Sequence, residues 1–179
     1  MICFDEFGPI EVRPQHGRAW RKVRHPARIR ATYRRTHGTR QYLAAYDLKS
    51  DRLIMRRYKR KRWQEVLLFL KHVRRQYPST IRLYVILDNF SPHKRAEVRK
   101  WAKAANVELV FTPTYASWLN RIEAIFAGVR YFALANSDYR NHEEIRKAIF
   151  AYVAWRNRNR NAASVKRREK HKMSFATGR

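Results

Sequence analysis

The sequence predicts an α/β fold, a mixed β-sheet with helices on both faces. Short apolar runs typical of strands alternate with segments of helical period from residue 63 onwards, and a predicted hairpin precedes them. This order of elements describes a mixed sheet covered by helices on its two faces. At 179 residues, the chain has room for one domain with one sizeable core.

The first third of the chain predicts a strand, a basic loop and a hairpin. Residues 1–4 are apolar and predict a strand at the very start. Residues 6–40 are loop-like, very basic and interrupted by glycine and proline, with residues 29–33 as a short strand inside them. Residues 41–46 and 53–58 flank Lys49-Ser50-Asp51 and predict a hairpin.

The middle of the chain predicts a helix, a strand, a second helix and a second strand. Apolar residues at helical spacing predict a helix that ends before Pro78. The nearly unbroken apolar run 81–87 predicts a strand covered on both faces, and residues 107–111 predict another buried strand. Ser91 and Pro92 predict the N-cap and first position of the helix between these strands.

Two further helices and a basic tail complete the chain. Ser117 predicts the N-cap of a helix whose apolar stripe runs from Leu119 to Ala133. Asn141, with Glu144 three residues later, predicts a capping box at the start of the last helix. The stretch 156–179 carries nine basic residues and one acidic residue, so we expect a disordered basic tail.

The amino-acid composition indicates which kinds of molecule the protein could bind. The 41 lysines and arginines outnumber the 14 acidic residues and give a formal net charge of +27, which favours a polyanion such as nucleic acid. A single cysteine, Cys3, excludes an intrachain disulfide framework and a cysteine-rich zinc site. No apolar run approaches the ~18 residues that span a bilayer, and the N-terminus has no signal-peptide pattern. We therefore expect a cytoplasmic protein that does not bind membranes.

Acidic residues are scarce, so their positions are informative. Asp88 follows the most apolar strand, and Asp5 lies at the end of the first strand, so the two carboxylates meet if the strands are neighbours. Glu123 lies at the edge of an apolar helix stripe and can turn towards the sheet. Three converging carboxylates need a cation between them, and oxygen ligands suit Mg²⁺ or Mn²⁺. Two such ions about 4 Å apart could drive phosphodiester cleavage or transfer.

Each of these acids also has a plain structural interpretation. Asp88 could form a turn or cap a helix, and Glu123 could be a solvated helix residue. Asp5 competes with its neighbour Glu6, because alternation along a strand points the two to opposite faces and periodicity alone does not choose between them.

Three stretches carry a resemblance to a known family. Residues 4–8 (FDEFG), 87–93 (LDNFSPH) and 113–123 (PTYASWLNRIE) resemble the three catalytic blocks of DDE transposases, closest to the bacterial insertion-sequence branch of the mariner-like superfamily. In that branch, 34 residues separate the second Asp from the Glu. Here 34 residues also lie between Asp88 and Glu123. The resemblance covers about residues 1–161.

The resemblance implies a fold, a site and a reaction. It implies an RNase H-like fold for residues 1–161, with 162–179 as the basic tail, and it assigns the first acid to Asp5 rather than Glu6. Asp5, Asp88 and Glu123 would be the catalytic residues and the ligands of two Mg²⁺ or Mn²⁺ ions. The reaction would be hydrolysis at transposon ends, followed by attack of the freed 3′-OH on target DNA.

The resemblance also implies partners. The substrate would be double-stranded DNA, and we expect a homo-oligomer on that DNA in a bacterial, nucleoid-associated setting. Family members carry a helix-turn-helix region before the first Asp, whereas this chain begins four residues before Asp5. We expect that part either from a separate reading frame or to be missing from a truncated copy.

Four polar residues near the acids are candidates for supporting roles. Asn89 and His93 follow Asp88, and His93 could hold a phosphate or the metal shell or be an exposed residue of the first helical turn. Asn120 lies one turn before Glu123 and could hold a water or the DNA backbone or act as a cap. Arg130, seven residues after Glu123, could present a cation to a phosphate or be solvated.

Two other functions remain open from the sequence. One is a ribonuclease H or junction nuclease, against which the Asp–Glu spacing argues. The other is a basic nucleic-acid-binding protein without catalysis, including a decayed transposase remnant, against which the intact acids argue. Trp20, Tyr115 and Trp118 lie in or beside loops and could stack on an unpaired base or pack internally.

Overall fold

A five-stranded mixed sheet forms the centre of the protein. The computed structural model describes residues 1–15, 37–114, 116 and 119–170. The strands are β1 (Ile2–Glu11), β2 (Thr39–Asp47), β3 (Arg52–Tyr58), β4 (Leu83–Leu87) and β5 (Val107–Phe111), in the sheet order β3-β2-β1-β4-β5. β1 is central, antiparallel to β2 and parallel to β4. The α/β fold class that the sequence predicts is confirmed.

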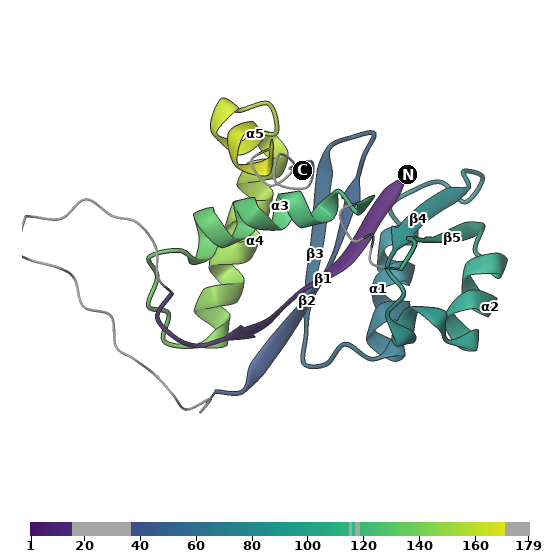
Figure 1. Cartoon of the computed structure of the whole chain (residues 1–179), viewed down its shortest axis with the longest axis horizontal. Coiled ribbons are helices and arrows are strands. Elements are labelled where there is room, and N and C mark those ends of the chain that lie inside the picture. Colours follow the sequence, from purple (N-terminus) through teal and green to yellow (C-terminus); the bar gives the residue numbers. More distant parts are fainter. Residues whose placement is uncertain (16–36, 115, 117–118, 171–179) are drawn as a thin grey trace, which may run out of the picture.

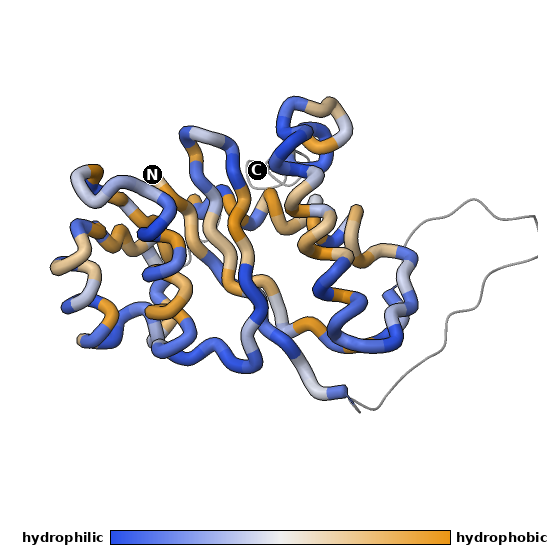
Figure 2. The backbone as a smooth tube through the Cα atoms, turned by 180° about the vertical axis from the view of Figure 1, so that it is seen from behind, coloured by the Kyte–Doolittle hydropathy of each residue, from blue (hydrophilic) through white to orange (hydrophobic). Residues whose placement is uncertain are grey.

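Helices cover both faces of the sheet (Figure 1). They are α1 (Trp63–Arg74), α2 (Ala96–Ala104), α3 (Ile122–Val129), α4 (His142–Arg158) and α5 (Ala163–Lys170). α1 and α2 pack on one face, α3 and α4 pack on the other, and α5 packs against α3. Figure 2 shows apolar backbone segments along the strands and polar segments in most of the connecting loops. Among the described residues, the helices are too short or too polar for any of them to cross a bilayer.

Alternation along β1 divides the core into two layers. Cys3 and Phe7 are buried against α3 and α4, whereas Ile2 and Phe4 are buried against α1 and α2. Cys3 is a free thiol with no exposed surface and serves as a small apolar side chain. Because the core is split in this way, consecutive residues of β1 reach different helical layers.

β1 extends further than the sequence predicts. The strand was expected to end at residue 4, but it runs to Glu11 because its second half pairs with β2, as far as Glu11 opposite Thr39. An irregularity between Phe7 and Ile10 accommodates Gly8 and Pro9, the residues that suggested a loop. Asp5 therefore lies inside the strand and not at its end.

Most of the expected elements are confirmed, including the hairpin, the helix at residue 63, the strand at 107–111 and the last helix. The Oδ1 atom of Asn141 accepts hydrogen bonds from the backbone N–H groups of Glu143 (2.9 Å) and Glu144 (3.0 Å). The side chain of Glu144 returns to the N–H of Arg140, one residue before the position that a capping box uses. The predicted N-cap is correct.

The segment around β4 differs from its prediction in two respects. β4 begins at Leu83, and Tyr84 is exposed, because the α3–α4 layer covers the β1–β3 side of the sheet and leaves this part of β4 open. Ser91 and Pro92 begin a short 3₁₀ turn (Ser91–Lys94), and the α-helix starts only after the extended residue Arg95. The tight turn carries His93 into the interior.

The third predicted helix begins later than expected. α3 starts at Ile122 and continues into a π-helical turn (Arg130–Leu134), and Leu119 is exposed and does not join the apolar stripe. The predicted cap Ser117, the short strand at 29–33 and the aromatic residues Trp20, Tyr115 and Trp118 lie outside the described residues.

The expectation of a disordered tail is wrong for residues 163–170, which form α5. The reason is a buried charge network that composition does not reveal. Arg156 has no exposed surface and forms ion pairs with Glu169 of α5 (3.0 Å) and with Asp51 of the β2–β3 turn. Tyr46 donates a hydrogen bond to Asp51 (2.8 Å). The network joins the hairpin, α4 and α5.

Replacing the buried cation should destabilise the fold. Arg156→Met leaves the carboxylates of Asp51 and Glu169 without their partner, which should cost about 3–5 kcal/mol of unfolding free energy. Arg158→Met, an exposed position on the same helix, is the matched control and should stay within about 0.5 kcal/mol of wild type. Urea denaturation measures both, and equal effects would contradict the role of the network.

Candidate active site

The pairing of β1 with β4 brings two acids together. Ile2 lies opposite Val85 and Cys3 opposite Ile86 in this parallel pair. The same register, continued by two residues, sets Asp5 beside Asp88, which directly follows β4. Cys3 contacts the α3–α4 layer, so alternation along β1 turns Asp5 to that layer as well.

The start of α3 brings the third acid to the same place. The Nδ2 atom of Asn120 donates to the carbonyl of Phe4, the residue before Asp5, over 2.7 Å. The backbone carbonyl of Asn120 accepts from the N–H of Glu123 (3.2 Å), which lies half-buried in the first turn of α3. Asn120 therefore ties the helix that carries Glu123 to the strand that carries Asp5.

The electrostatics of Asp5 reflect this convergence. Burial is the main cause that raises the pKa of Asp5 to about 7. The N–H of Glu6 donates to its carboxylate over 2.7 Å and opposes the shift, whereas the negative charges of Glu6, Asp88 and Glu123 increase it. Asp5 is thus partly desolvated and repelled by its acidic neighbours, and a cation would relieve that repulsion.

A buried histidine connects Asp88 to the residue after Asp5. The Nδ1 atom of His93 lies 2.9 Å from Oδ1 of Asp88, and its Nε2 atom lies 2.9 Å from Oε1 of Glu6. Burial lowers the pKa of His93, but the hydrogen bonds to the two carboxylates outweigh it and raise this pKa to about 9. The hydrogen bond from His93 is also the main cause that lowers the pKa of Asp88.

A basic loop reaches the same network. It comprises residues 59–62, Lys59-Arg60-Lys61-Arg62, between β3 and α1. The Nζ atom of Lys61 lies 3.7 Å from Oε2 of Glu6 and 4.5 Å from the centre of the Phe90 ring. The loop therefore lies at the end of the sheet where β4 stops.

The four residues predicted to support the acids have different contacts in the structure. Asn89 donates to the carbonyl of Thr112 (2.6 Å) and so ties the end of β4 to the end of β5. His93 is buried and not an exposed residue of a helical turn. Asn120 is buried, and its Oδ1 atom has no hydrogen-bond partner among the residues that the structure describes. The Arg130 guanidinium lies 5.0 Å from the centre of the Phe7 ring, two residues along β1 from Asp5.

The donor set fits a hard divalent cation. Among the residues that the structure describes, no three acidic, histidine or cysteine side chains are already grouped closely enough to hold an ion. The chemistry is nevertheless that of Mg²⁺ or Mn²⁺, since the carboxylates of Asp88 and Glu123 lie near enough to act on Asp5 by charge and Oδ1 of Asn120 could accept a hydrogen bond from a bound water. Asp5, Asp88 and Glu123 are the residues that would hold the ion.

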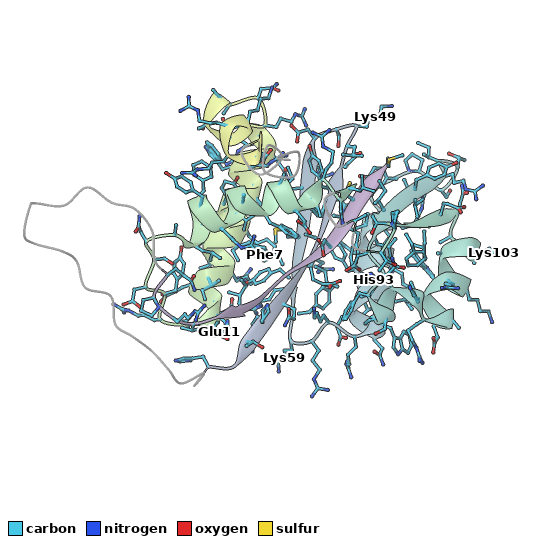
Figure 3. The ribbon with its side chains drawn as sticks, viewed as in Figure 1. Phe7, Glu11, Lys49, Lys59, His93 and Lys103 are labelled. Atoms are coloured by element: carbon cyan, nitrogen blue, oxygen red, sulfur yellow. The ribbon has the colours of Figure 1, made fainter. Side chains whose placement is uncertain are left out.

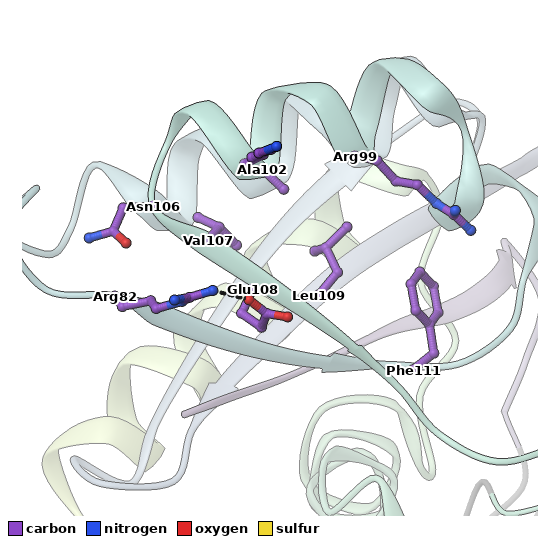
Figure 4. Close-up of a pocket in the computed structure, with 9 residues that line it drawn as sticks. Arg82, Arg99, Ala102, Asn106, Val107, Glu108, Leu109 and Phe111 are labelled. Atoms are coloured by element: carbon purple, nitrogen blue, oxygen red, sulfur yellow. Dashed lines mark hydrogen bonds and ion pairs between the residues drawn. The ribbon is translucent and has the colours of Figure 1, made fainter.

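A pocket of about 600 Å³ lies away from these acids, between α2 and the edge strand β5 (Figure 4). Arg99 and Lys103 of α2 line it, and Arg82 is paired there with Glu108. None of the sequence-predicted site residues lines this pocket. The candidate site is therefore defined by the acids and not by a deep cavity.

The fold and the acids define the class of protein. A mixed sheet in the order 3-2-1-4-5, with acids on its central parallel pair and on a covering helix, is an RNase H-like fold. Residues 1–146 match the family described as DDE superfamily endonuclease, and the chain belongs to that family. No curated protein matches the chain.

Solved structures of the Mos1 mariner transposase share the fold. The Mos1 paired end complex with Mn is 16% identical, covers 99% of this chain and 56% of its own, and has a TM-score of 0.66. The Mos1 strand transfer complex is 17% identical, with 95% and 51% covered and a TM-score of 0.65. The complex with Mg is 17% identical, with 97% and 54% covered and a TM-score of 0.64. The chain spans about half the length of these relatives.

Sequence reasoning missed two participants. Glu6 was considered only as a competitor of Asp5, yet it lies on the other face and binds His93 and Lys61. Lys61 belongs to a run of basic residues that looks like a solvated loop. No periodic signal links either residue to Asp88, because the link passes through a histidine that sits 87 residues after Glu6.

Removing the charge of Asp5 should stabilise the metal-free fold. In the unfolded chain Asp5 ionises near pH 4, whereas its folded pKa is about 7, so wild type loses stability as pH rises between these values. Asp5→Asn lacks this loss. In EDTA, the variant should gain unfolding free energy over wild type at pH 8, and the gain should shrink by pH 5. Denaturation curves at both values measure it, and a gain independent of pH would contradict the raised pKa.

Proposed function

We propose that this chain is the catalytic domain of a transposase that cuts DNA at the ends of an insertion sequence and transfers the cut strand to a target. Membership of the DDE superfamily endonucleases and the likeness to Mos1 support the proposal. The observation that carries it is the register of β1 and β4, which sets Asp5 beside Asp88 while Asn120 brings Glu123 to the same strand.

Each acid has a role in the proposed chemistry. Asp5, Asp88 and Glu123 would hold two divalent ions, Mg²⁺ or Mn²⁺, and such ions would supply Lewis-acid activation of the attacking oxygen and charge stabilisation of the leaving oxygen. Burial and the neighbouring negative charges raise the pKa of Asp5, so its carboxylate would be stabilised by a cation. Asn120 would accept a hydrogen bond from a bound water through Oδ1, since its Nδ2 already donates to Phe4.

The basic loop is the proposed contact for the DNA backbone. Lys59, Arg60 and Arg62 are exposed, and Lys61 is fixed beside Glu6 and Phe90. Lys59 lies at one end of the β2–β3 hairpin and Lys49 at the other (Figure 3). Cations at the Lys59 end would neutralise the phosphates that flank a scissile bond held at the acids.

The proposed setting is a homo-oligomer on DNA at the bacterial nucleoid, in the cytoplasm. The Mos1 structures with this fold are paired end and strand transfer complexes. In the described part of this chain each helix packs an apolar face against the sheet or a neighbouring helix. Selection of the ends would then depend on a separately encoded helix-turn-helix part, because phosphate contacts alone do not read sequence.

Loss of any one acid should abolish strand cleavage. Asp5→Asn, Asp88→Asn and Glu123→Gln each remove a ligand that stabilises transition-state charge, so Mn²⁺-dependent nicking of supercoiled DNA should fall to background. Glu97→Gln, an exposed acid on α2, is the control and should cut like wild type. Near-normal cleavage by Glu123→Gln would refute the assignment, and cleavage confined to an RNA–DNA hybrid would favour a ribonuclease H.

Neutralising the basic loop should weaken DNA binding in a salt-dependent way. Lys59→Gln with Arg60→Gln removes two exposed cations, so the slope of log affinity against log salt should decrease by about 2. Lys49→Gln with Arg52→Gln removes the same charge at the opposite end of the hairpin and is the matched control. Fluorescence anisotropy in a salt series measures both, and equal slopes for the two double variants would show that the loop has no special role.

A further inference from the structure

His93 is a rigid bridge between two carboxylates. It has no exposed surface, and the carboxylate of Glu6 is only 8% exposed. Nε2 lies 2.9 Å from Oε1 of Glu6, and Nδ1 lies 2.9 Å from Oδ1 of Asp88 and 3.3 Å from its backbone carbonyl oxygen, so both ring nitrogens face acceptors and can act as donors. The ring is also held between aromatic neighbours, with its centre 5.1 Å from that of Phe4 and 5.5 Å from that of Phe90. Figure 3 shows His93 close to the central strand.

Glu6 is not in a position to hold the ion itself. Alternation along β1 turns it to the α1–α2 face, away from the face of Asp5. Its Oε1 atom is bound by His93 and its Oε2 atom lies 3.7 Å from Lys61. Because both of its oxygens already face cationic groups, the buried carboxylate of Glu6 interacts with His93 and Lys61 and is not available to an ion.

The contacts of Asp88 show what the bridge can do. Oδ1 of Asp88 accepts a hydrogen bond from the N–H of Phe90 (3.0 Å) and lies 2.9 Å from Nδ1 of His93, which is also 3.3 Å from the backbone carbonyl oxygen of Asp88. Both contacts to the carboxylate use the same oxygen, which leaves Oδ2 as the donor to an ion. Hydrogen bonds of this kind orient metal ligands, and their loss typically lowers metal affinity about 10–100-fold.

We propose that Glu6 is a positioning residue that fixes the carboxylate of Asp88 for metal binding and acts through His93. The inference rests on the proposed function of Asp88 as a metal ligand. Glu6 holds the Nε2 side of the ring, so the Nδ1 side stays aligned with Asp88. Without Glu6, the Nε2–H group would be buried and unpaired, and the ring would tilt to find another acceptor.

The test is a double-mutant cycle on Mn²⁺ affinity, followed by the free Mn²⁺ signal in electron paramagnetic resonance. Glu6→Leu removes the acceptor and should weaken Mn²⁺ binding about 10–100-fold, whereas Glu6→Gln keeps an acceptor for Nε2–H and should stay close to wild type. Glu97→Leu, an exposed acid on α2, is the matched control and should leave the affinity unchanged.

The second arm tests the route through His93. In His93→Asn, the side-chain amide can take the place of Nδ1 and keep the bond to Asp88 while the link to Glu6 is lost. Adding Glu6→Leu to His93→Asn should therefore change the affinity little further. An equal loss in both backgrounds would show that Glu6 acts by another route and would overturn the inference, as would wild-type affinity in Glu6→Leu.

Crystal structures of the metal-free proteins separate this inference from the proposed function. The carboxylate of Asp88 should be displaced in Glu6→Leu and in place in Glu6→Gln, and an unmoved Asp88 in Glu6→Leu would overturn the inference even if wild type bound no Mn²⁺. If wild type binds Mn²⁺ but cuts no DNA, the transposase proposal fails and the affinity cycle still decides the role of Glu6. Urea denaturation without metal shows whether any loss of affinity is merely a loss of folding.

Discussion

The burial of the Asp5 carboxylate in the central strand, beside other acids, is the constraint on which the candidate site depends. Apolar residues normally occupy the centre of a mixed sheet, yet the parallel register of β1 and β4 sets Asp5 beside Asp88 there, and α3 adds Glu123. The raised pKa of Asp5 records the cost of this arrangement. Apolar packing on both faces of the sheet offsets this cost. Phe4 and Phe7, close to Asp5 along β1, are buried on opposite faces.

The sequence was a good guide where periodicity and local chemistry determine structure. The hairpin, α1 and the Asn141 cap follow from patterns within about a dozen residues, and the spacing from Asp88 to Glu123 carried the family resemblance. It was a poor guide where tertiary pairing prevails. β1 passes through Gly8 and Pro9 because β2 pairs with it, and α5 forms because Arg156 needs a second carboxylate. Neither cause is visible in the local residues.

The surplus of positive charge explains how acids are used elsewhere in the chain. Several described acids pair with a cation at a junction between elements, as Asp51 and Glu169 do around Arg156 and as Glu143 does with Arg57. In these places acids relieve repulsion among the many cations and join elements together. Asp5 is the contrasting case, since the charges that act on it are those of the acids Glu6, Asp88 and Glu123. A basic protein that gathers acids in one place creates a local site for a cation on a surface otherwise suited to phosphates.

The side chains of the adjacent residues Asp5 and Glu6 lie on opposite faces of β1 and so reach the two different helical layers. Alternation sends Asp5 to the layer of α3, where Glu123 lies, and Glu6 to the layer of α1 and the turn that carries His93. His93 then returns from that second layer to Asp88, on the neighbouring strand. Asp5 is thus in contact with one helical layer and Asp88 with the other, so both layers contribute to the candidate metal site. In the proposed site, these two adjacent acids have complementary roles: Asp5 would bind an ion, and Glu6 would keep Asp88 in place through His93.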